Sequence, residues 1–319
     1  MNAGTWFVLG WRWGGRLPDW LRLGLAAGVA DAAWLRHGAG VRRLERNLAR
    51  VRPEATPREL RALSRRGMRS YLRYFAEIFA MPALTDAQLD ARVRAVGHEL
   101  VVSEIAAGRS CILALGHLGN WDLAGAWAHR HLGPVTTVAE RLEPASLFEA
   151  FNRFRNGFHI DAIPLSGSGA DVFRQLVRVA RTDARVIPLL ADRDLTAKGI
   201  EVDFFGERAR VAAGPAALAV ATGSVLIPVV VYHERLVGAR RRAAGSRWGV
   251  VLDFGESIPI PAGRPSADVV GRLTQAWVTA FEGMVRRHAE DWHMLQRVFV
   301  SDLDPDRDSV VRSRAGGPA

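Results

Sequence analysis

The 319-residue sequence contains one cysteine, Cys111, and one lysine, Lys198. A single cysteine excludes an intrachain disulfide and a cysteine-rich metal cluster, and we interpret Cys111 as a small buried residue in a strand. The most apolar stretch, residues 21–34, is interrupted by Arg22 and Asp31 and is too short to cross a bilayer. The sequence also lacks a Gly-x-Ser-x-Gly elbow, a phosphate-binding P-loop and a dinucleotide fingerprint, which argues against a serine hydrolase and against ATP or NAD.

The formal net charge is +10, and almost all of the positive charge is arginine. Arginine is weakly hydrated and binds phosphate through its planar fork, so this composition favours nucleic acid, an anionic bilayer or a phosphorylated cofactor as partner. The basic residues are not joined to any RNA-recognition, zinc-finger or helix-turn-helix signature. We therefore predict an anionic membrane surface and no nucleic acid as partner, with a basic nucleic-acid-binding α/β protein as the rival class.

The first 40 residues combine aromatic residues with arginines. Tryptophan prefers the headgroup level of a bilayer, and arginine pairs with anionic lipid, so we expect this segment to lie on a membrane without spanning it. The alternative is that these aromatic residues pack into the core of the protein. The residues concerned are Trp6, Phe7, Trp11, Trp13 and Trp20, interleaved with Arg12, Arg16 and Arg22.

The pattern along the chain changes near residue 90. Before it, residues 57–79 repeat apolar positions at helical spacing, and Thr56 with Glu59 forms a capping box. The arginines of this helix form either a solvated face or a basic face turned towards lipid phosphates. We expect a helical membrane-surface segment at 1–90, an α/β domain at 91–300 and a flexible tail at 301–319.

From about residue 93, short apolar runs alternate with helical periods. This alternation predicts an α/β fold with a mixed, mainly parallel sheet flanked by helices, to which the N-terminal helices are a membrane-associating extension. The expected strands are 111–115, 135–139, 162–164, 186–190, 225–232 and 249–254, and the expected helices are 121–131, 144–156, 170–181, 215–222 and 267–288.

The segment LALGHLGNWDLAGAW at 113–127 is the most informative in the chain. An apolar strand ends at Gly116, His117 follows, and a helix begins after Asn120, so His117 lies at the carboxyl end of a strand where α/β sheets bind ligands. A carboxylate on one ring nitrogen would leave the other free to take a proton from an alcohol. We expect the Gly119–Asn120 turn and the helix start to hold an oxyanion.

Several segments resemble one protein family. The His117-x-x-x-x-Asp122 motif is similar to that of glycerolipid and lysophospholipid acyltransferases, and the chain more closely resembles the bacterial lipid A acyltransferases, in particular their actinobacterial phosphatidylinositol mannoside branch. The matching segments are RRLERNLARV at 42–51, LALGHLGNWDLAGAW at 113–127, TVAERLEP at 137–144, RFRNGFHIDAIPL at 153–165, the long segment at 189–219 and AEDWHMLQ at 289–296.

The resemblance implies helices around a mixed sheet, peripheral association with the cytoplasmic face of the plasma membrane, acyl-CoA as donor and a mannose of a phosphatidylinositol mannoside as acceptor. It implies His117 as the base, Asp122 as the motif acid, and Glu140 and Arg155 as polar groups of the active site. Close relatives often carry glutamate at the position of Asp192, so either Asp122 or Asp192 is the partner of His117. A lipid A-type or lysophospholipid acceptor is the alternative, and an acyl carrier protein is an alternative donor.

The remaining candidates follow from position. Asp192, Arg193 and Asp194 come directly after a strand, on the rim expected for His117, although they can equally form a surface ion-pair cluster. Arg155 can bind a phosphate of the donor or acceptor, or pair with Glu140. We expect Trp121, Phe204 and Phe205 either to line an acyl groove or to pack in the core. The predicted mechanism is direct transfer by His117, with Asn120 near the substrate and no metal or further cofactor.

Overall fold

The computed structural model describes residues 10, 14–140, 144–165, 169–194, 199–261 and 266–303. In this part of the chain, seven strands form one sheet with the order β1-β9-β8-β2-β5-β3-β4. All neighbouring strands run parallel except β8 and β9, which are antiparallel. The strands are β1 (Val93–Val96), β2 (Cys111–Leu115), β3 (Val135–Glu140), β4 (Ile160–Leu165), β5 (Val186–Leu190), β8 (Val225–Arg235) and β9 (Trp248–Phe254).

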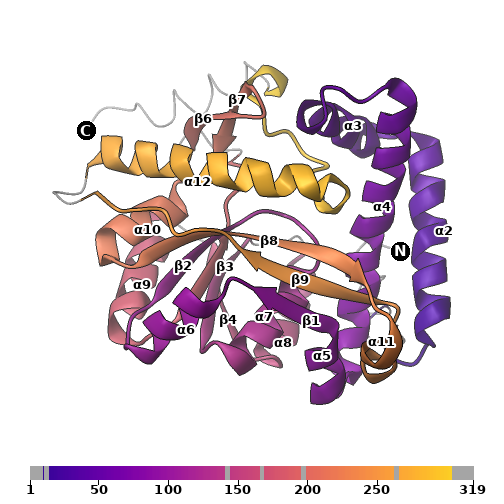
Figure 1. Cartoon of the computed structure of the whole chain (residues 1–319), viewed down its shortest axis with the longest axis horizontal. Helices are drawn as coiled ribbons and strands as arrows, with labels where there is room; N and C mark the ends of the chain where they lie inside the picture. The colour runs from indigo at the N-terminus through magenta and orange to yellow at the C-terminus, as the bar shows by residue number, and fades with distance from the viewer. Residues whose placement is uncertain are drawn as a thin grey trace.

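Helices cover both faces of this sheet, so the predicted α/β class with a mixed, mainly parallel sheet is confirmed (Figure 1). One layer contains α5 (Asp86–Arg92), α6 (Glu99–Ala106), α7 (Trp121–His131) and α8 (Ala145–Asn156). The other contains α9 (Gly169–Thr182), α10 (Gly214–Thr222) and α12 (Ala267–Arg287).

The central strand β2 shows why its sequence is continuously apolar. Leu113 and Leu115 belong to the core on the α7 side, whereas Ile112 and Ala114 belong to the core beneath α12. A strand buried on both faces has no polar side to alternate with. Cys111 is fully buried at its start, as interpreted from the sequence, and burial raises the pKa of its thiol to about 12.

Three long helices precede the sheet: α2 (Asp19–Arg36), α3 (Ala39–Val51) and α4 (Pro57–Ala80). The capping box predicted at the start of α4 is confirmed, with Thr56 and Glu59 exchanging side-chain and backbone hydrogen bonds. The N-terminal helices share a hydrophobic core with α12, since Leu44 and Leu48 of α3 belong to the same buried cluster as Trp277.

Residues 199–211 form a hairpin that was not among the expected strands. It consists of β6 (Ile200–Phe204) and β7 (Glu207–Val211), joined by Phe205 and Gly206. Both turn residues have positive φ angles, 51° and 81°, as a type I′ turn requires. Phe204 and Phe205 are buried in the core beneath α12. Of the two roles expected for them, they therefore pack in the core and do not line an acyl groove.

The described elements are completed by α11 (Gly238–Ala244) and the short helices η1 (Met81–Ala83), η2 (Ala289–Asp291) and η3 (Val300–Asp302). Among the described helices, none has the length and apolar character needed to cross a membrane. The expected tail at 301–319 begins within η3, and its residues 304–319 lie outside the described residues, as do Trp6, Phe7, Trp11, Arg12 and Trp13.

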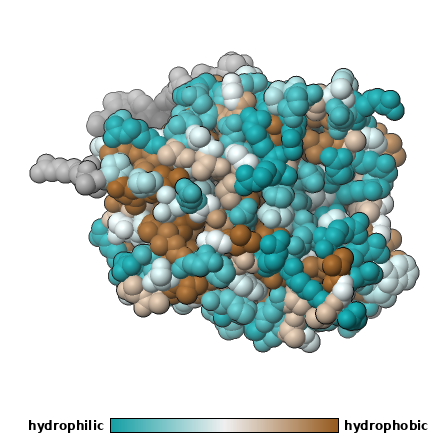
Figure 2. All heavy atoms as spheres, viewed as in Figure 1, coloured by the Kyte–Doolittle hydropathy of each residue, from teal (hydrophilic) through white to brown (hydrophobic). Residues whose placement is uncertain are grey.

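The face over α3 and α4 is mainly hydrophilic, whereas apolar residues gather at the left of the view, below α12 (Figure 2). On α4, Arg65 and Arg69 both pair with Asp31, and Arg61 pairs with Glu45. Part of the expected basic face is therefore neutralised within the protein.

Candidate active site

His117 lies in the short loop between the end of β2 at Leu115 and the start of α7 at Trp121. The two glycines of this loop are required by close approach. A Cβ on Gly116 would lie 2.7 Å from Oδ2 of Asp192 and 2.4 Å from the ring of Phe281. Gly119 has φ 56°, and a Cβ there would lie 2.4 Å from the carbonyl oxygen of Val231. The loop therefore holds His117 tightly at the carboxyl edge of the central strand.

Asp192 is the carboxylate that contacts His117. It follows β5, which pairs with β2 in parallel, so the ends of the two strands bring residues 75 positions apart together. The distance from Nδ1 of His117 to Oδ1 of Asp192 is 2.6 Å, and the His117 backbone N–H donates to Oδ2 at 2.9 Å. The Nε1–H of Trp292 also donates to Oδ2, at 2.8 Å.

This arrangement keeps Asp192 ionised and fixes the imidazole of His117. Burial alone would raise the pKa of Asp192, but the charge and hydrogen bonds of His117 and the Trp292 hydrogen bond hold it below its usual value. Because an ionised carboxylate only accepts, Nδ1 of His117 is the donor in this contact, and Nε2 is the ring nitrogen that can exchange a proton with a substrate. The Asp192 carboxylate has no exposed surface, whereas the His117 side chain is 24% exposed.

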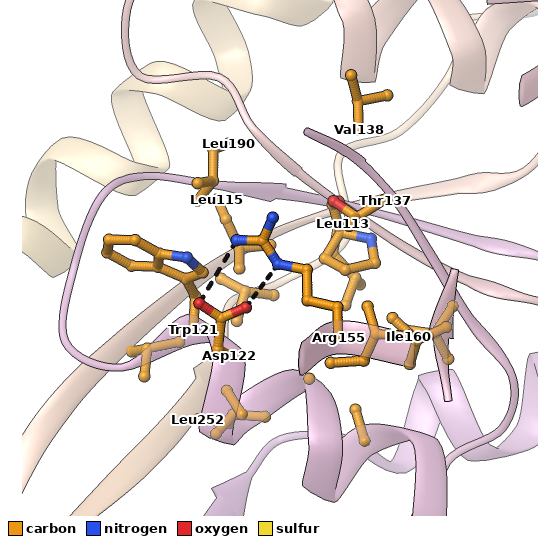
Figure 3. A pocket seen from close by; sticks show the side chains of 18 of the residues that line it. Leu113, Leu115, Trp121, Asp122, Thr137, Val138, Arg155, Ile160, Leu190 and Leu252 are labelled. Atoms are coloured by element: carbon orange, nitrogen blue, oxygen red, sulfur yellow. Dashed lines mark hydrogen bonds and ion pairs between the residues drawn. The ribbon is translucent and has the colours of Figure 1, made fainter. Parts of the chain in front are cut away.

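Asp122, the acid of the sequence motif, binds other partners. Its Oδ1 accepts from Nε of Arg155 at 2.8 Å, and its Oδ2 accepts from the Tyr74 hydroxyl at 2.7 Å. Figure 3 shows the Asp122 carboxylate and the Arg155 guanidinium facing one another beside Trp121. Burial lowers the pKa of Arg155, but Asp122 outweighs this and raises it overall. Of the two carboxylates left open by the sequence, the structure pairs His117 with Asp192.

Asn120 caps α7 from a fully buried position. Its Oδ1 accepts from the backbone N–H of Leu123 at 3.0 Å, and its Nδ2 donates to Oε2 of Glu77 at 2.9 Å. The side chain predicted to contact substrate is thus engaged in holding the loop. The N–H of Gly119 donates to the carbonyl of Asp291 at 3.1 Å, so it is not available for the oxyanion that we expected it to bind.

The predicted rim residues meet at the ends of β3 and β5. Glu140 ends β3 with an exposed side chain, and Nη2 of Arg193 lies 3.3 Å from its Oε2. The possible Arg155–Glu140 pair is not formed, because Arg155 turns to Asp122. The backbone N–H of Asp194 donates to the backbone carbonyl of Arg210 on β7, and this hydrogen bond connects the rim to the hairpin.

A buried polar cluster behind the His117 loop was not anticipated from the sequence. His233 of β8 lies between two carboxylates, with Nδ1 2.8 Å from Asp291 and Nε2 3.3 Å from Glu77. Ser70 of α4 contacts His233, Asp291 and His293. The cluster contacts the His117 loop at three points. Glu77 binds Asn120, the Asp291 carbonyl accepts from Gly119, and the backbone N–H of His293 donates to the carbonyl of His117 at 2.7 Å.

The two buried histidines of this cluster carry opposite pKa shifts. Burial lowers the pKa of His233, but Glu77 and Asp291 outweigh it and raise that pKa above its ordinary value. Burial lowers the pKa of His293 to about 3, against the attraction of Asp291. His233 is therefore a buried cation between two anions, whereas His293 is neutral. No sequence pattern brings together residues from α4, β8 and 291–293, so only the fold reveals this cluster.

An apolar slot runs between the sheet and α7. It is lined by residues of six neighbouring strands, from β9 to β4, and holds about 70 Å³ of free space. Small residues of α7, Ala124, Gly125 and Ala128, leave the space. Trp121, Asp122 and Arg155 line it as well, and the centroid of the Trp121 ring lies 5.8 Å from that of the His117 ring.

Comparisons with known proteins show the family of the chain. The family model of bacterial lipid A biosynthesis acyltransferases matches residues 1–301. A phosphatidylinositol mannoside acyltransferase of Mycolicibacterium smegmatis is 36% identical over 97% of this chain and 94% of its own length. A protein of the same name from Mycobacterium tuberculosis is 37% identical over 98% and 94%.

Among solved structures, the 1-acyl-sn-glycerophosphate acyltransferase PlsC of Thermotoga maritima is matched with a TM-score of 0.33 and 15% identity, over 68% of this chain and 86% of that one. The family match spans nearly all of the sequence and includes the loop of His117, the strand end of Asp192 and the segment of Trp292. The chain therefore belongs to the bacterial lipid A biosynthesis acyltransferase family and is an acyltransferase.

Proposed function

We propose that the protein transfers a long-chain acyl group from acyl-CoA to a mannose hydroxyl of a phosphatidylinositol mannoside, with His117 as general base. One observation carries the chemical part of this proposal: a partly exposed imidazole is fixed through Nδ1 by a buried carboxylate, next to a tryptophan that lines an apolar slot. The names of the mycobacterial relatives support the acceptor.

The proton path follows from the His117–Asp192 pair. Nε2 of His117 accepts the proton of the sugar hydroxyl as its oxygen attacks the thioester carbonyl. The C–S bond then breaks, the acyl group is joined to the sugar oxygen, and the proton on Nε2 passes to the sulfur of coenzyme A. Asp192 stabilises the imidazolium between these steps, which is the role of a buried carboxylate on the opposite ring nitrogen.

The acyl chain occupies the slot beneath α7. Its lining is mainly aliphatic, which suits a hydrocarbon chain, and the chain would have to widen the present free space of about 70 Å³ as it enters. The thioester then lies beside Trp121, at the start of α7. The first-turn N–H groups of a helix are oriented towards its N-terminal end and are suited to the oxyanion of the tetrahedral intermediate.

The polar rim holds the sugar and the donor headgroup. Glu140 is exposed and able to accept hydrogen bonds from sugar hydroxyls, while Arg193 beside it offers a guanidinium to a phosphate. Asp194 completes the rim at the end of β5. Arg155 acts through Asp122 and Trp121, by keeping the start of α7 in position, and not by binding phosphate itself.

The protein acts at the cytoplasmic face of the plasma membrane as a peripheral enzyme. Helix α2 supports this location, since Trp20, Leu25, Val29 and Leu35 are all more than half exposed. Exposed apolar residues beside arginines are typical of a helix that lies at a lipid interface. Acyl-CoA is a cytoplasmic donor, and the single cysteine fits a reducing compartment.

Mass spectrometry of reaction products tests the proposal. Purified protein is incubated with palmitoyl-CoA and, in turn, a phosphatidylinositol mannoside, a lipid A precursor and lysophosphatidic acid. We expect one added palmitoyl group on the mannolipid, located on a mannose by fragmentation. Acylation of either other acceptor in preference to the mannolipid would refute the acceptor assignment.

A further inference from the structure

A second hollow lies on the surface, away from the slot. It is a groove between α2, α4 and the ends of β8 and β9, with about 270 Å³ of free space. Small residues of α2 form one wall. The other walls carry four arginines and a tryptophan, and a second tryptophan stands on α2: Arg69, Arg73, Arg235 and Arg247, with Trp248 and Trp20.

Three of these arginines are not neutralised within the described part of the protein. Arg69 is bound to Asp31, but no carboxylate of the described residues forms an ion pair with Arg73, Arg235 or Arg247. Burial lowers the pKa of Arg73, and the nearby Arg235 and Arg69 lower it further, against Glu77 and Asp291. Like charges held together in a partly dry groove attract an anion.

Trp248 holds two of the guanidinium groups. Their central carbons lie 3.6 Å (Arg73) and 4.1 Å (Arg235) from its ring centroid. A guanidinium that stacks on an indole is held by its face, while the N–H groups along its edge remain directed outwards. Each edge can bind two phosphate oxygens at once. An arginine that moves freely on the surface would lose side-chain entropy when it binds in this way, whereas these two are already held in place.

The groove is separate from the reaction centre. Gly119 of the catalytic loop packs against Val231 of β8, and Arg235 lies four residues further along that strand, about 13 Å away. Between the groove and the loop lies the buried cluster, because the ring of His233 is 6.1 Å from Trp248 and His233 also contacts Glu77. A molecule in the groove is thus not the one that reacts at His117.

An exposed tryptophan of α2 stands beside the groove. Trp20 lines it and is 65% exposed, whereas the exposed Leu25 and Val29 lie on the far side of the helix at 100° per residue. Tryptophan prefers the headgroup level of a bilayer, so a basic site beside this ring fits the phosphate of a membrane lipid.

We propose that this groove binds the phosphate of an anionic glycerophospholipid at the membrane surface, beside Trp20. The lipid is a fixed membrane contact of the enzyme and not its substrate. The proposal rests on the membrane-surface part of the proposed function and is independent of which acceptor is acylated.

The test compares two double variants that remove the same charge. Arg235→Gln with Arg247→Gln removes two arginines of the groove, whereas Arg241→Gln with Arg242→Gln removes two exposed arginines at the end of α11. Binding to phosphatidylcholine vesicles with and without phosphatidylinositol is measured by co-sedimentation, using the full chain. Circular dichroism checks that each variant is folded.

We expect the groove variant to lose at least about tenfold in affinity for the anionic vesicles, from the usual contribution of two basic residues at a charged surface, and the α11 variant to lose clearly less. Equal losses would overturn the proposal, because unspecific attraction depends only on net charge. Release of the wild-type protein from vesicles by millimolar inorganic phosphate, at constant ionic strength, would show a site for free phosphate and also overturn it. Acyl transfer by the wild-type protein in detergent tests the proposed function separately, so the two failures are distinguishable.

Discussion

At the scale of single residues, His117 is fixed by a carboxylate that lies far away along the chain. A histidine between two glycines after an apolar strand indicates its position, because the glycines are required by contacts with Asp192 and Val231. The nearby acid of the motif, Asp122, is turned towards Arg155 and Tyr74. The carboxylate that reaches the ring is 75 residues away, and only the pairing of β2 with β5 brings it there.

The two carboxylates should therefore respond differently to removal of their charge. We expect Asp192→Asn to lower kcat by about 10³- to 10⁴-fold with little change in KM, because the imidazolium loses its counter-charge. Asp122→Asn should instead destabilise the fold by about 3 kcal/mol, because Arg155 is left without its buried partner, and keep kcat within about tenfold. Steady-state kinetics and urea unfolding measure both. A larger loss of kcat in Asp122→Asn at a temperature where it is folded would reverse the assignment.

At the scale of elements, the sequence predicts the bounds of those helices and strands whose residues follow a clear apolar or periodic pattern. The strands β2 and β5 and the helix α7 have the predicted bounds, because each is a long apolar or periodic run. The hairpin β6–β7 alternates apolar and polar residues, but its turn is Phe205–Gly206, and a phenylalanine with φ 51° is not a turn signal. The edge strand β1 has four residues and pairs on one side only, so its pattern is too short to recognise.

The acyl slot is a feature of one element, since the free space exists because the residues of α7 that face the sheet are small. A Cβ on Gly125 would lie 3.1 Å from Cδ1 of Ile160. We expect Gly125→Leu to fill the slot near β4 and to lower palmitoyl transfer relative to octanoyl transfer by about tenfold or more. Gly271→Leu is the control, since a side chain on that α12 glycine meets open space. An equal fall for both chain lengths would argue against this slot as the acyl site.

At the scale of the whole molecule, the His117 loop is supported by a buried charge cluster that joins α4, β8 and the segment after α12. The cluster holds a charged His233 and a neutral His293 near one another. Composition predicts a sizeable core but not which polar groups it contains, so this support was invisible from the sequence. The expected division at residue 90 stays a prediction, although the N-terminal helices and α12 share one core.

His293 should give the protein an acid-sensitive stability. In the unfolded chain a histidine binds a proton near pH 6.5, whereas the pKa of the folded His293 is about 3. Between these values the unfolded state binds the extra proton, so stability falls as the pH falls, by about 1.4 kcal/mol per pH unit. Urea unfolding between pH 4.5 and 6 should show that His293→Gln reduces this slope, while His131→Gln on the surface does not. An unchanged slope in His293→Gln would mean that the ring is charged in the folded protein.

The most direct test of the account is the rate of acyl transfer in His117→Ala. Purified wild-type and variant proteins are saturated with palmitoyl-CoA and mixed with the phosphatidylinositol mannoside, and the acylated product is followed over a single turnover. If Nε2 of His117 takes the proton of the sugar hydroxyl, the rate should fall by at least about 10²-fold while the unfolding midpoint is nearly unchanged. A folded variant that transfers the acyl group at the wild-type rate would contradict the mechanism.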